Sequence, residues 1–61
     1  MNIKALRIKK GWTQQDFANK LGVSQQTIAK WENDKGMPTA DKLPAIAKAL
    51  SVPMEALYKE A

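Results

Sequence analysis

The sequence contains no cysteine and no histidine, so neither disulfide bonds nor the usual zinc ligand sets are available to it. The same two absences remove the commonest general base and the best nucleophile of enzymes. We therefore expect a protein that is not an enzyme, with no catalytic residue, no metal, no cofactor and no small-molecule substrate. Its core must come from apolar side chains alone, which make up 44% of 61 residues. A chain of this length forms a single small domain, which we place at residues 1–61.

Long apolar runs are lacking as well. No stretch approaches the roughly 18 residues of a membrane-spanning helix, so we expect no membrane association. The N-terminal sequence Met1-Asn2-Ile3-Lys4 lacks the apolar segment of a secretory signal. These two absences favour a cytoplasmic protein.

Acidic residues are scarce in the first half of the chain. Residues 1–30 contain six basic residues and one acidic residue, whereas residues 31–61 contain four basic and five acidic residues. A basic half on a small protein favours a polyanionic partner, nucleic acid first and an anionic membrane second. Lysines that only keep a surface solvated would give the same distribution, so charge alone does not decide the partner.

Alternating patterns of β-branched residues are absent, and the chain instead consists of short helical segments between helix start and stop signals. The first helix ends at Gly11, which can adopt the left-handed conformation. Thr13 caps the second helix, with Asp16 in the position of a capping box, and Gly22 ends it. Ser24 caps the third helix.

Turn-forming residues at positions 33–38 predict an exposed loop after the third helix. Because Pro44 lacks an N–H and belongs in a first turn, we start the fourth helix near Asp41 or Lys42 and end it near Leu50. A final short helix is expected at residues 54–58. The fold class is thus all-α, a compact bundle of five helices with the inward positions Ile3, Leu6, Phe17, Ala18, Leu21, Ile28, Trp31, Leu43, Ile46, Ala47 and Leu50.

The segment 13–33 has the spacing of a helix-turn-helix. Only Gly22-Val23-Ser24 separate the second and third helices, and so short a turn containing glycine makes two helices cross steeply. Ala18 is small where the two helices would approach most closely, and Ile28 packs beneath the turn. A generic tight helix pair would use similar residues, but the joint pattern favours a helix-turn-helix at residues 14–33.

A series of residues at fixed spacings runs through nearly the whole chain. It comprises Ile3-x-x-Leu6-Arg7, Gly11-x-Thr13-Gln14-x-x-x-Ala18-x-x-Leu21-Gly22-Val23-Ser24, Ile28-x-x-Trp31-Glu32-Asn33, Pro38, Leu43, Ile46-Ala47 and Leu50. With this ordered set the chain resembles the phage lambda repressor and Cro-like (XRE-type) helix-turn-helix family. The resemblance implies a lambda-repressor-like DNA-binding domain and a sequence-specific transcriptional regulator, more often a repressor. It also implies a homodimer on a double-stranded DNA operator, with the third helix in the major groove.

The face of the third helix opposite its apolar positions carries Gln25, Gln26, Ala29 and Lys30. A glutamine amide offers a donor and an acceptor side by side, which match N7 and N6 of adenine. Lysine can bind guanine O6 and N7 or a phosphate, and Ala29 can offer its methyl group to thymine. These residues would also suit a solvated helix surface, but together with the motif they predict base contacts.

Phosphate contacts are expected on both sides of the third helix. By resemblance, Thr13 and Gln14 lie at the N-terminus of the second helix, where free N–H groups and the helix dipole attract an anion. Asn33 and Lys35 would bind the DNA backbone on the other side, together with N–H groups of their loop. Asp34 in the same loop would repel a phosphate, so it must point away or the loop contact is weakened.

Arg7 and Glu32 fall on inward helix faces, where an unpaired charge is costly. We expect an ion pair between them that links the first helix to the end of the third, and the family resemblance points the same way. Arg7 could at the same time contact a phosphate with its other N–H groups. Trp12 and Trp31 could stack on a partner, but their spacing is more typical of core residues.

The C-terminal part departs from the family pattern. Ser51 stands where the family often has a glycine that closes the fourth helix, and Pro53 stands where it often has a serine cap. The final helix would then begin with proline at its first position. Met54 and Leu57 could complete the monomer core. Because this helix often contributes to the dimer in the family, the expected dimer contacts are Met54, Ala56 and Tyr58.

A second function fits the same fold. An antitoxin-like or accessory subunit would act mainly through a protein partner, and it would expose an apolar patch away from the third helix. An enzyme would need a base beside a nucleophile, and the sequence positions no base for Ser24, Ser51 or Tyr58.

Overall fold

The computed structural model describes residues 1–59 and contains four α-helices: α1 (Ile3–Lys9), α2 (Gln14–Leu21), α3 (Gln25–Glu32) and α4 (Leu43–Leu50). Two short 3₁₀ helices accompany them, η1 (Ala40–Lys42) before α4 and η2 (Met54–Tyr58) after it. The described residues form no β-strand, which confirms the all-α class. No helix in this part of the chain is long and apolar enough to span a membrane.

The expected count of five helices is wrong, because the last segment, η2, is a 3₁₀ helix. Pro53 precedes it in an extended conformation and, having no polar side chain, provides no cap. A segment this short gains too few hydrogen bonds to offset the cost of starting an α-helix. The start of the fourth helix lies within two residues of the expected Asp41 or Lys42. The segment η1 leads directly into α4, which begins at Leu43 with Pro44 in its first turn.

The boundaries of α2 and α3 follow from capping residues. Thr13 and Asp16 form a reciprocal capping box, in which the Asp16 N–H donates to Thr13 Oγ1 at 3.0 Å and the Thr13 N–H donates to Asp16 Oδ2 at 2.9 Å. Ser24 caps α3 by accepting the Thr27 N–H at 3.2 Å. Gly22 closes α2 in the left-handed conformation, with φ of 71°. A short turn of defined geometry therefore joins the two helices.

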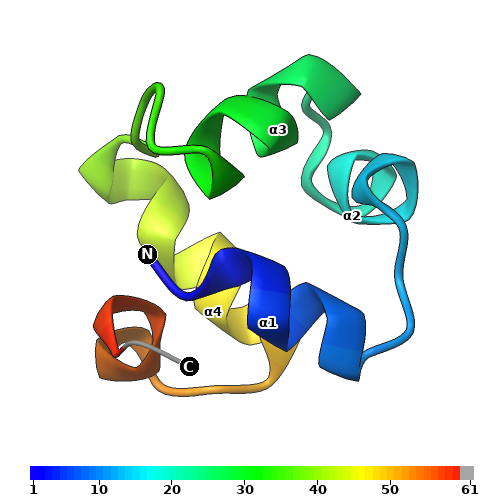
Figure 1. Cartoon of the computed structure of the whole chain (residues 1–61). Coiled ribbons are helices and arrows are strands. Elements are labelled where there is room, and N and C mark those ends of the chain that lie inside the picture. The colour runs from blue at the N-terminus through cyan, green and yellow to red at the C-terminus, as the bar shows by residue number, and fades with distance from the viewer. Residues whose placement is uncertain (60–61) are drawn as a thin grey trace.

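The helices enclose one apolar core (Figure 1). The most extensive helix contact is between α2 and α3, while α4 packs against α2 and α1 packs against α3. The segment η2 lies beside the N-terminus, where the Asn2 N–H donates to the Leu57 carbonyl oxygen at 2.7 Å (Figure 1). The buried apolar side chains are Ile3, Phe17, Ala18, Ile28, Trp31, Ile46, Ala47, Leu50 and Leu57.

The aromatic residues and the C-terminal apolar residues divide between core and surface. Leu57 is fully buried and completes the core, whereas Met54 is 45% exposed and does not. Trp31 is buried in the core. Trp12 is half-buried and stacks on Phe17, with ring centroids 5.8 Å apart. Both tryptophans therefore take part in packing.

Ser51 ends α4 in a left-handed conformation, with φ of 59°. A Cβ atom costs roughly 1–2 kcal/mol there, and the extra freedom of glycine in the unfolded chain offsets about 0.4–1 kcal/mol of that cost. We expect Ser51→Gly to raise the free energy of unfolding by about 0.5–1 kcal/mol and the melting temperature by several degrees. Thermal unfolding followed by circular dichroism measures this change. Ser51→Ala is the control, because it keeps the Cβ atom and should not stabilise; equal stability of the two variants would contradict the prediction.

Candidate nucleic-acid interface

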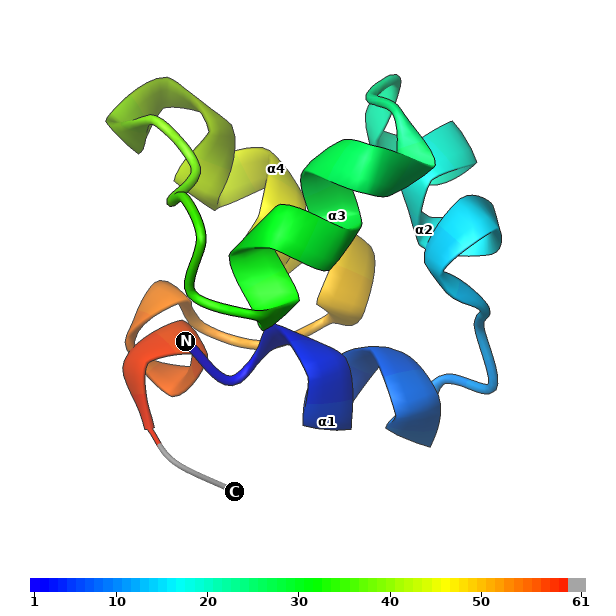
Figure 2. The same cartoon turned by 45° about the horizontal axis from the view of Figure 1, so that its top comes forward.

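The outer side of α3 is open to a partner. Figure 2 shows α3 at the front of the molecule, with no other segment between it and the viewer. Gln26 and Lys30 are exposed on this helix, and Ala29 is half-exposed. Ile28 and Trp31 are buried on its inner side. The structure thus separates the residues predicted to read bases from those that hold the helix in place.

The turn between α2 and α3 sets the angle at which α3 is presented. Gly22 provides the left-handed residue of the turn, and the Val23 N–H donates to the Ala18 carbonyl oxygen at 3.0 Å. Ala18 itself is completely buried where α2 packs on the rest of the core. A larger side chain at this position would push the helices apart. The local sequence therefore fixes α2 and α3 as one unit.

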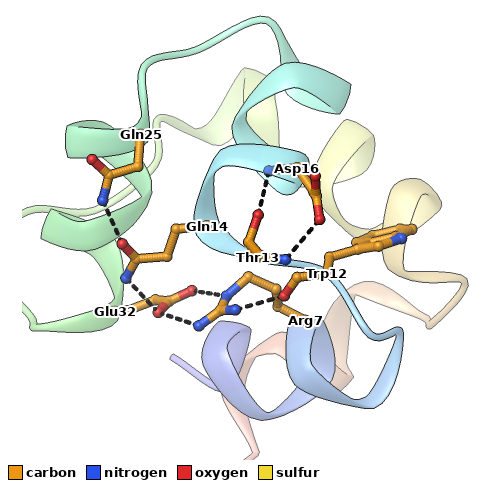
Figure 3. Close-up of polar contacts among 7 residues, drawn as sticks. All are labelled: Arg7, Trp12, Thr13, Gln14, Asp16, Gln25 and Glu32. Atoms are coloured by element: carbon orange, nitrogen blue, oxygen red, sulfur yellow. Dashed lines mark hydrogen bonds and ion pairs between the residues drawn. The ribbon is translucent and has the colours of Figure 1, made fainter.

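Gln25, the first residue of α3, is half-buried and bonded to α2. Its Nε2 donates to Gln14 Oε1 at 2.5 Å, and Gln14 Nε2 donates in turn to Glu32 Oε1 at 3.1 Å (Figure 3). Sequence reasoning placed Gln14 against a phosphate and missed this link. No sequence spacing could reveal it, because the three side chains meet only through the crossing of the two helices.

Glu32, at the end of this link, also forms a buried ion pair with Arg7. Arg7 Nε lies 2.7 Å from Glu32 Oε2, Arg7 Nη2 donates to Glu32 Oε1 at 3.1 Å, and Arg7 Nη1 donates to the Trp12 carbonyl oxygen at 2.7 Å (Figure 3). The side chains of Arg7 and Glu32 are only 9% and 2% exposed. The pair therefore joins α1, the loop before α2 and the end of α3, and the suggestion that Arg7 also reaches a phosphate does not fit this burial.

The N-terminus of α2, where a phosphate contact is predicted, also carries the carboxylate of Asp16. The capping box already uses the N–H groups of Thr13 and Asp16, and a first turn has further N–H groups without helical partners, those of Gln14 and Gln15. Hydrogen bonds from the backbone and the side chain of Thr13 hold the pKa of Asp16 below its usual value. An ionised Asp16 thus stabilises the positive end of the helix and repels any anion on its own side of that end.

The loop after α3 is less available to DNA than expected. The N–H groups of Asn33, Asp34 and Lys35 donate to the carbonyl oxygens of Ala29, Trp31 and Lys30 at 3.0, 3.4 and 2.8 Å. These three N–H groups close the end of α3 and are not free for a phosphate, which restricts the expected backbone contact to the rest of the loop. The side chains of Asn33 and Lys35 are exposed. The exposed side chain of Asp34 has Oδ1 3.9 Å from the Met1 amino nitrogen.

The expected dimer residues lie on η2. Met54 and Tyr58 are 45% and 55% exposed, and Ala56 is half-exposed. Large apolar side chains on one short segment provide contact area for a second protein molecule.

Elsewhere in residues 1–59, hydrogen bonds from the Thr39 side chain and the Asp41 backbone lower the pKa of Asp41. That same stretch contains no cluster of three acidic residues able to bind a metal ion.

Comparison with known proteins agrees with this geometry. A family model described as helix-turn-helix matches residues 3–57. The chain is 40% identical over 55 residues to the HTH-type transcriptional activator BcrR of Enterococcus faecalis. The aligned segment covers 90% of this chain and 27% of BcrR. It is 35% identical over 52 residues to the antitoxin HipB of Escherichia coli strain K12. This second aligned segment covers 85% of this chain and 59% of HipB. The chain thus spans about a quarter of the length of the activator and about three fifths of that of the antitoxin.

The family match extends from the first residue of α1 to Leu57, the last buried residue of the core. It includes the glycine turn, the open outer side of α3 and the buried pair beneath it. The chain therefore belongs to the XRE-type, lambda repressor and Cro-like helix-turn-helix family of DNA-binding regulators.

Proposed function

We propose that this protein is a sequence-specific regulator of transcription that binds a double-stranded DNA operator as a homodimer, with α3 in the major groove. The observation that carries the proposal is the bare outer side of α3, where Gln26 and Lys30 are exposed. An α-helix fits the major groove, and the groove presents a different pattern of donors and acceptors for each base pair. We also propose a repressor role, which the resemblance to the lambda repressor implies, and a cytoplasmic location. No catalytic chemistry is required.

Four side chains of α3 are proposed to read base edges. Gln25 and Gln26 each present an amide that matches adenine, while Lys30 can reach guanine or a phosphate. Ala29 is small enough to bring its methyl group against a thymine methyl. One turn separates Gln26 from Lys30, so their side chains project together from the same side of the helix.

Phosphate contacts are proposed on either side of α3. Thr13 and Gln14 at the start of α2 form the first group, supported by the N–H groups of that helix end. The exposed side chains of Asn33 and Lys35 form the second group, since the backbone N–H groups of residues 33–35 already bond to carbonyl oxygens of α3. Such contacts position the protein on the duplex and carry no sequence information of their own.

The size of the domain supports binding as a dimer. Its largest extent is 24 Å, whereas two-fold operators have half-sites roughly 34–36 Å apart. One copy therefore covers one half-site, and a complete operator needs two. We assign the contact between copies to Met54, Ala56 and Tyr58 on η2.

Selection of bound duplexes from random oligonucleotides tests this function. We expect an enriched sequence with two-fold symmetry and half-sites one helical turn apart. Affinities for the enriched and a scrambled duplex, measured at several salt concentrations, then separate base reading from charge attraction. Equal binding to all duplexes, even at low ionic strength, would contradict the proposal.

Replacement of Lys35 tests the phosphate contact alone. We expect Lys35→Ala to weaken binding of all duplexes to a similar extent and to lower the slope of log K against log salt by about 1. Lys48→Ala is the control, because Lys48 is exposed on α4, outside the proposed interface. Fluorescence anisotropy titrations provide both quantities. A change in base preference, or a slope equal to that of the control, would remove Lys35 from the interface.

A role as an antitoxin-like or accessory subunit is the second candidate, because one of the relatives is an antitoxin. Exposed apolar side chains away from α3, Met54 and Tyr58, provide a surface for a protein partner. The two candidates differ in what these side chains contact. Substitution of Met54 and Tyr58 by polar residues should abolish dimers on DNA in the first case. In the second it should leave DNA binding intact and abolish association with a different protein.

A further inference from the structure

We propose that Glu32 is a positioning residue for base specificity: it fixes which atoms of the Gln25 amide face the DNA. The inference rests on the proposed function, because Gln25 is taken to read a base. The side chain of Glu32, at the far end of α3, is buried and would not touch the duplex. Its influence passes through Gln14, whose side chain lies between Glu32 and Gln25 (Figure 3).

The first step follows from what a carboxylate can do. An ionised carboxylate accepts hydrogen bonds and donates none. Two donors of Arg7 hold the carboxylate group of Glu32 in place, one on each oxygen. A neighbouring amide can therefore approach Glu32 only with its NH₂ group, as Gln14 Nε2 does at 3.1 Å from Oε1. This contact determines which way round the Gln14 amide lies.

The second step carries the orientation to α3. With its NH₂ group on Glu32, Gln14 directs its amide oxygen toward Gln25. This oxygen needs a hydrogen-bond donor, and Gln25 Nε2 is that donor. The Gln25 amide then keeps one N–H and its oxygen for a partner. One donor beside one acceptor matches N7 and the N6 amino group of adenine.

The reversed arrangement would have a different preference. If Gln14 turned its NH₂ group toward Gln25, the Gln25 oxygen would accept from it and both N–H groups of Gln25 would face outward. Two donors match the two acceptors of guanine, O6 and N7. The Glu32 carboxylate excludes this arrangement, because it would then face the oxygen of Gln14. A glutamine at position 32 would allow both arrangements, since an amide both donates and accepts.

The experiment compares adenine and guanine at the base that Gln25 reads in the selected duplex. A good bidentate contact discriminates by roughly 5- to 150-fold, and we expect Glu32→Gln to reduce the adenine preference of the wild type by at least about fivefold. Gln14→Met should do the same, because it cuts the link and leaves the Arg7–Glu32 pair intact. In the double variant the two effects should not add, since both act through one chain of contacts.

Arg7→Lys separates positioning from a merely structural role. It keeps a charged partner for Glu32 but loses the two-pronged contact, so we expect a lower urea midpoint with an unchanged adenine preference. In the free protein, the side-chain amide proton signals of Gln25 should shift in Glu32→Gln and Gln14→Met and stay in place in Arg7→Lys. If the wild type prefers adenine and Gln14→Met keeps that preference, the inference is overturned while the proposed function stands. A wild type without any base preference would overturn the proposed function and, with it, this inference.

Discussion

Glu32→Leu should lower the free energy of unfolding by about 3–5 kcal/mol, because it leaves the buried Arg7 guanidinium with neither an opposite charge nor a hydrogen-bond acceptor at position 32, whereas Glu32→Gln keeps an acceptor of the same shape. Both side chains are almost inaccessible, at 9% exposure for Arg7 and 2% for Glu32. The core of a domain this small rarely supplies more than about 3–5 kcal/mol. The variant should therefore be largely unfolded at room temperature, with lost helical circular dichroism and no cooperative urea transition.

The double variant Arg7→Met/Glu32→Leu is the matched control for this experiment. Two apolar side chains of similar size replace a buried ion pair without leaving a charge unpaired, which is often neutral or stabilising by about 1–4 kcal/mol. We expect the double variant to fold with a urea midpoint near or above that of the wild type. A single Glu32→Leu variant as stable as the double variant would show that the pair contributes nothing to the fold.

The double variant Gln25→Ala/Gln26→Ala should strongly reduce operator preference while the protein stays folded. Each lost base contact is worth about 1–3 kcal/mol of discrimination, so the ratio of specific to nonspecific affinity should fall by roughly 30-fold or more. Alanine is the best helix former, and Gln26 is exposed, so α3 should persist. Nonspecific binding should remain, because the phosphate contacts are untouched.

Gln15→Ala provides the comparison for this loss. Gln15 is an exposed glutamine on α2 whose Nε2 donates to Asn19 Oδ1, also on α2, at 2.8 Å, so its removal changes side-chain composition without touching α3. Affinities for the operator and a scrambled duplex at one salt concentration decide the outcome. If the Gln25→Ala/Gln26→Ala double variant kept the preference of the Gln15→Ala control, the outer side of α3 would not be the reading surface.

Much of the helix-turn-helix was predictable because its signals are local. Thr13 with Asp16, Gly22 and Ser24 act within one turn of chain, and the structure shows each in its expected capping role. The pairing of Arg7 with Glu32 was also inferable, since two opposite charges on inward faces have few other ways to be satisfied. These features depend on spacing and on elementary electrostatics.

Other features depended on distances that no local pattern encodes. The link from Glu32 through Gln14 to Gln25 needs the crossing angle of α2 and α3. Residues 54–58 follow Pro53 and form only a five-residue segment, η2. The spacing of apolar residues over so short a segment could not distinguish a 3₁₀ helix from an α-helix. That the N–H groups of Asn33, Asp34 and Lys35 close the end of α3 becomes visible only in three dimensions, so the sequence could not remove them from the predicted phosphate contact.

The packing order along the chain also has a kinetic consequence. The segments α2 and α3, η1 and α4, and α4 and η2 each contact their neighbour in sequence. Helical chains dominated by such local contacts close few long loops and fold in microseconds to milliseconds. The first helix differs, because Arg7 meets a partner 25 positions away. We therefore expect the two central helices to assemble early and the N-terminal helix to dock last.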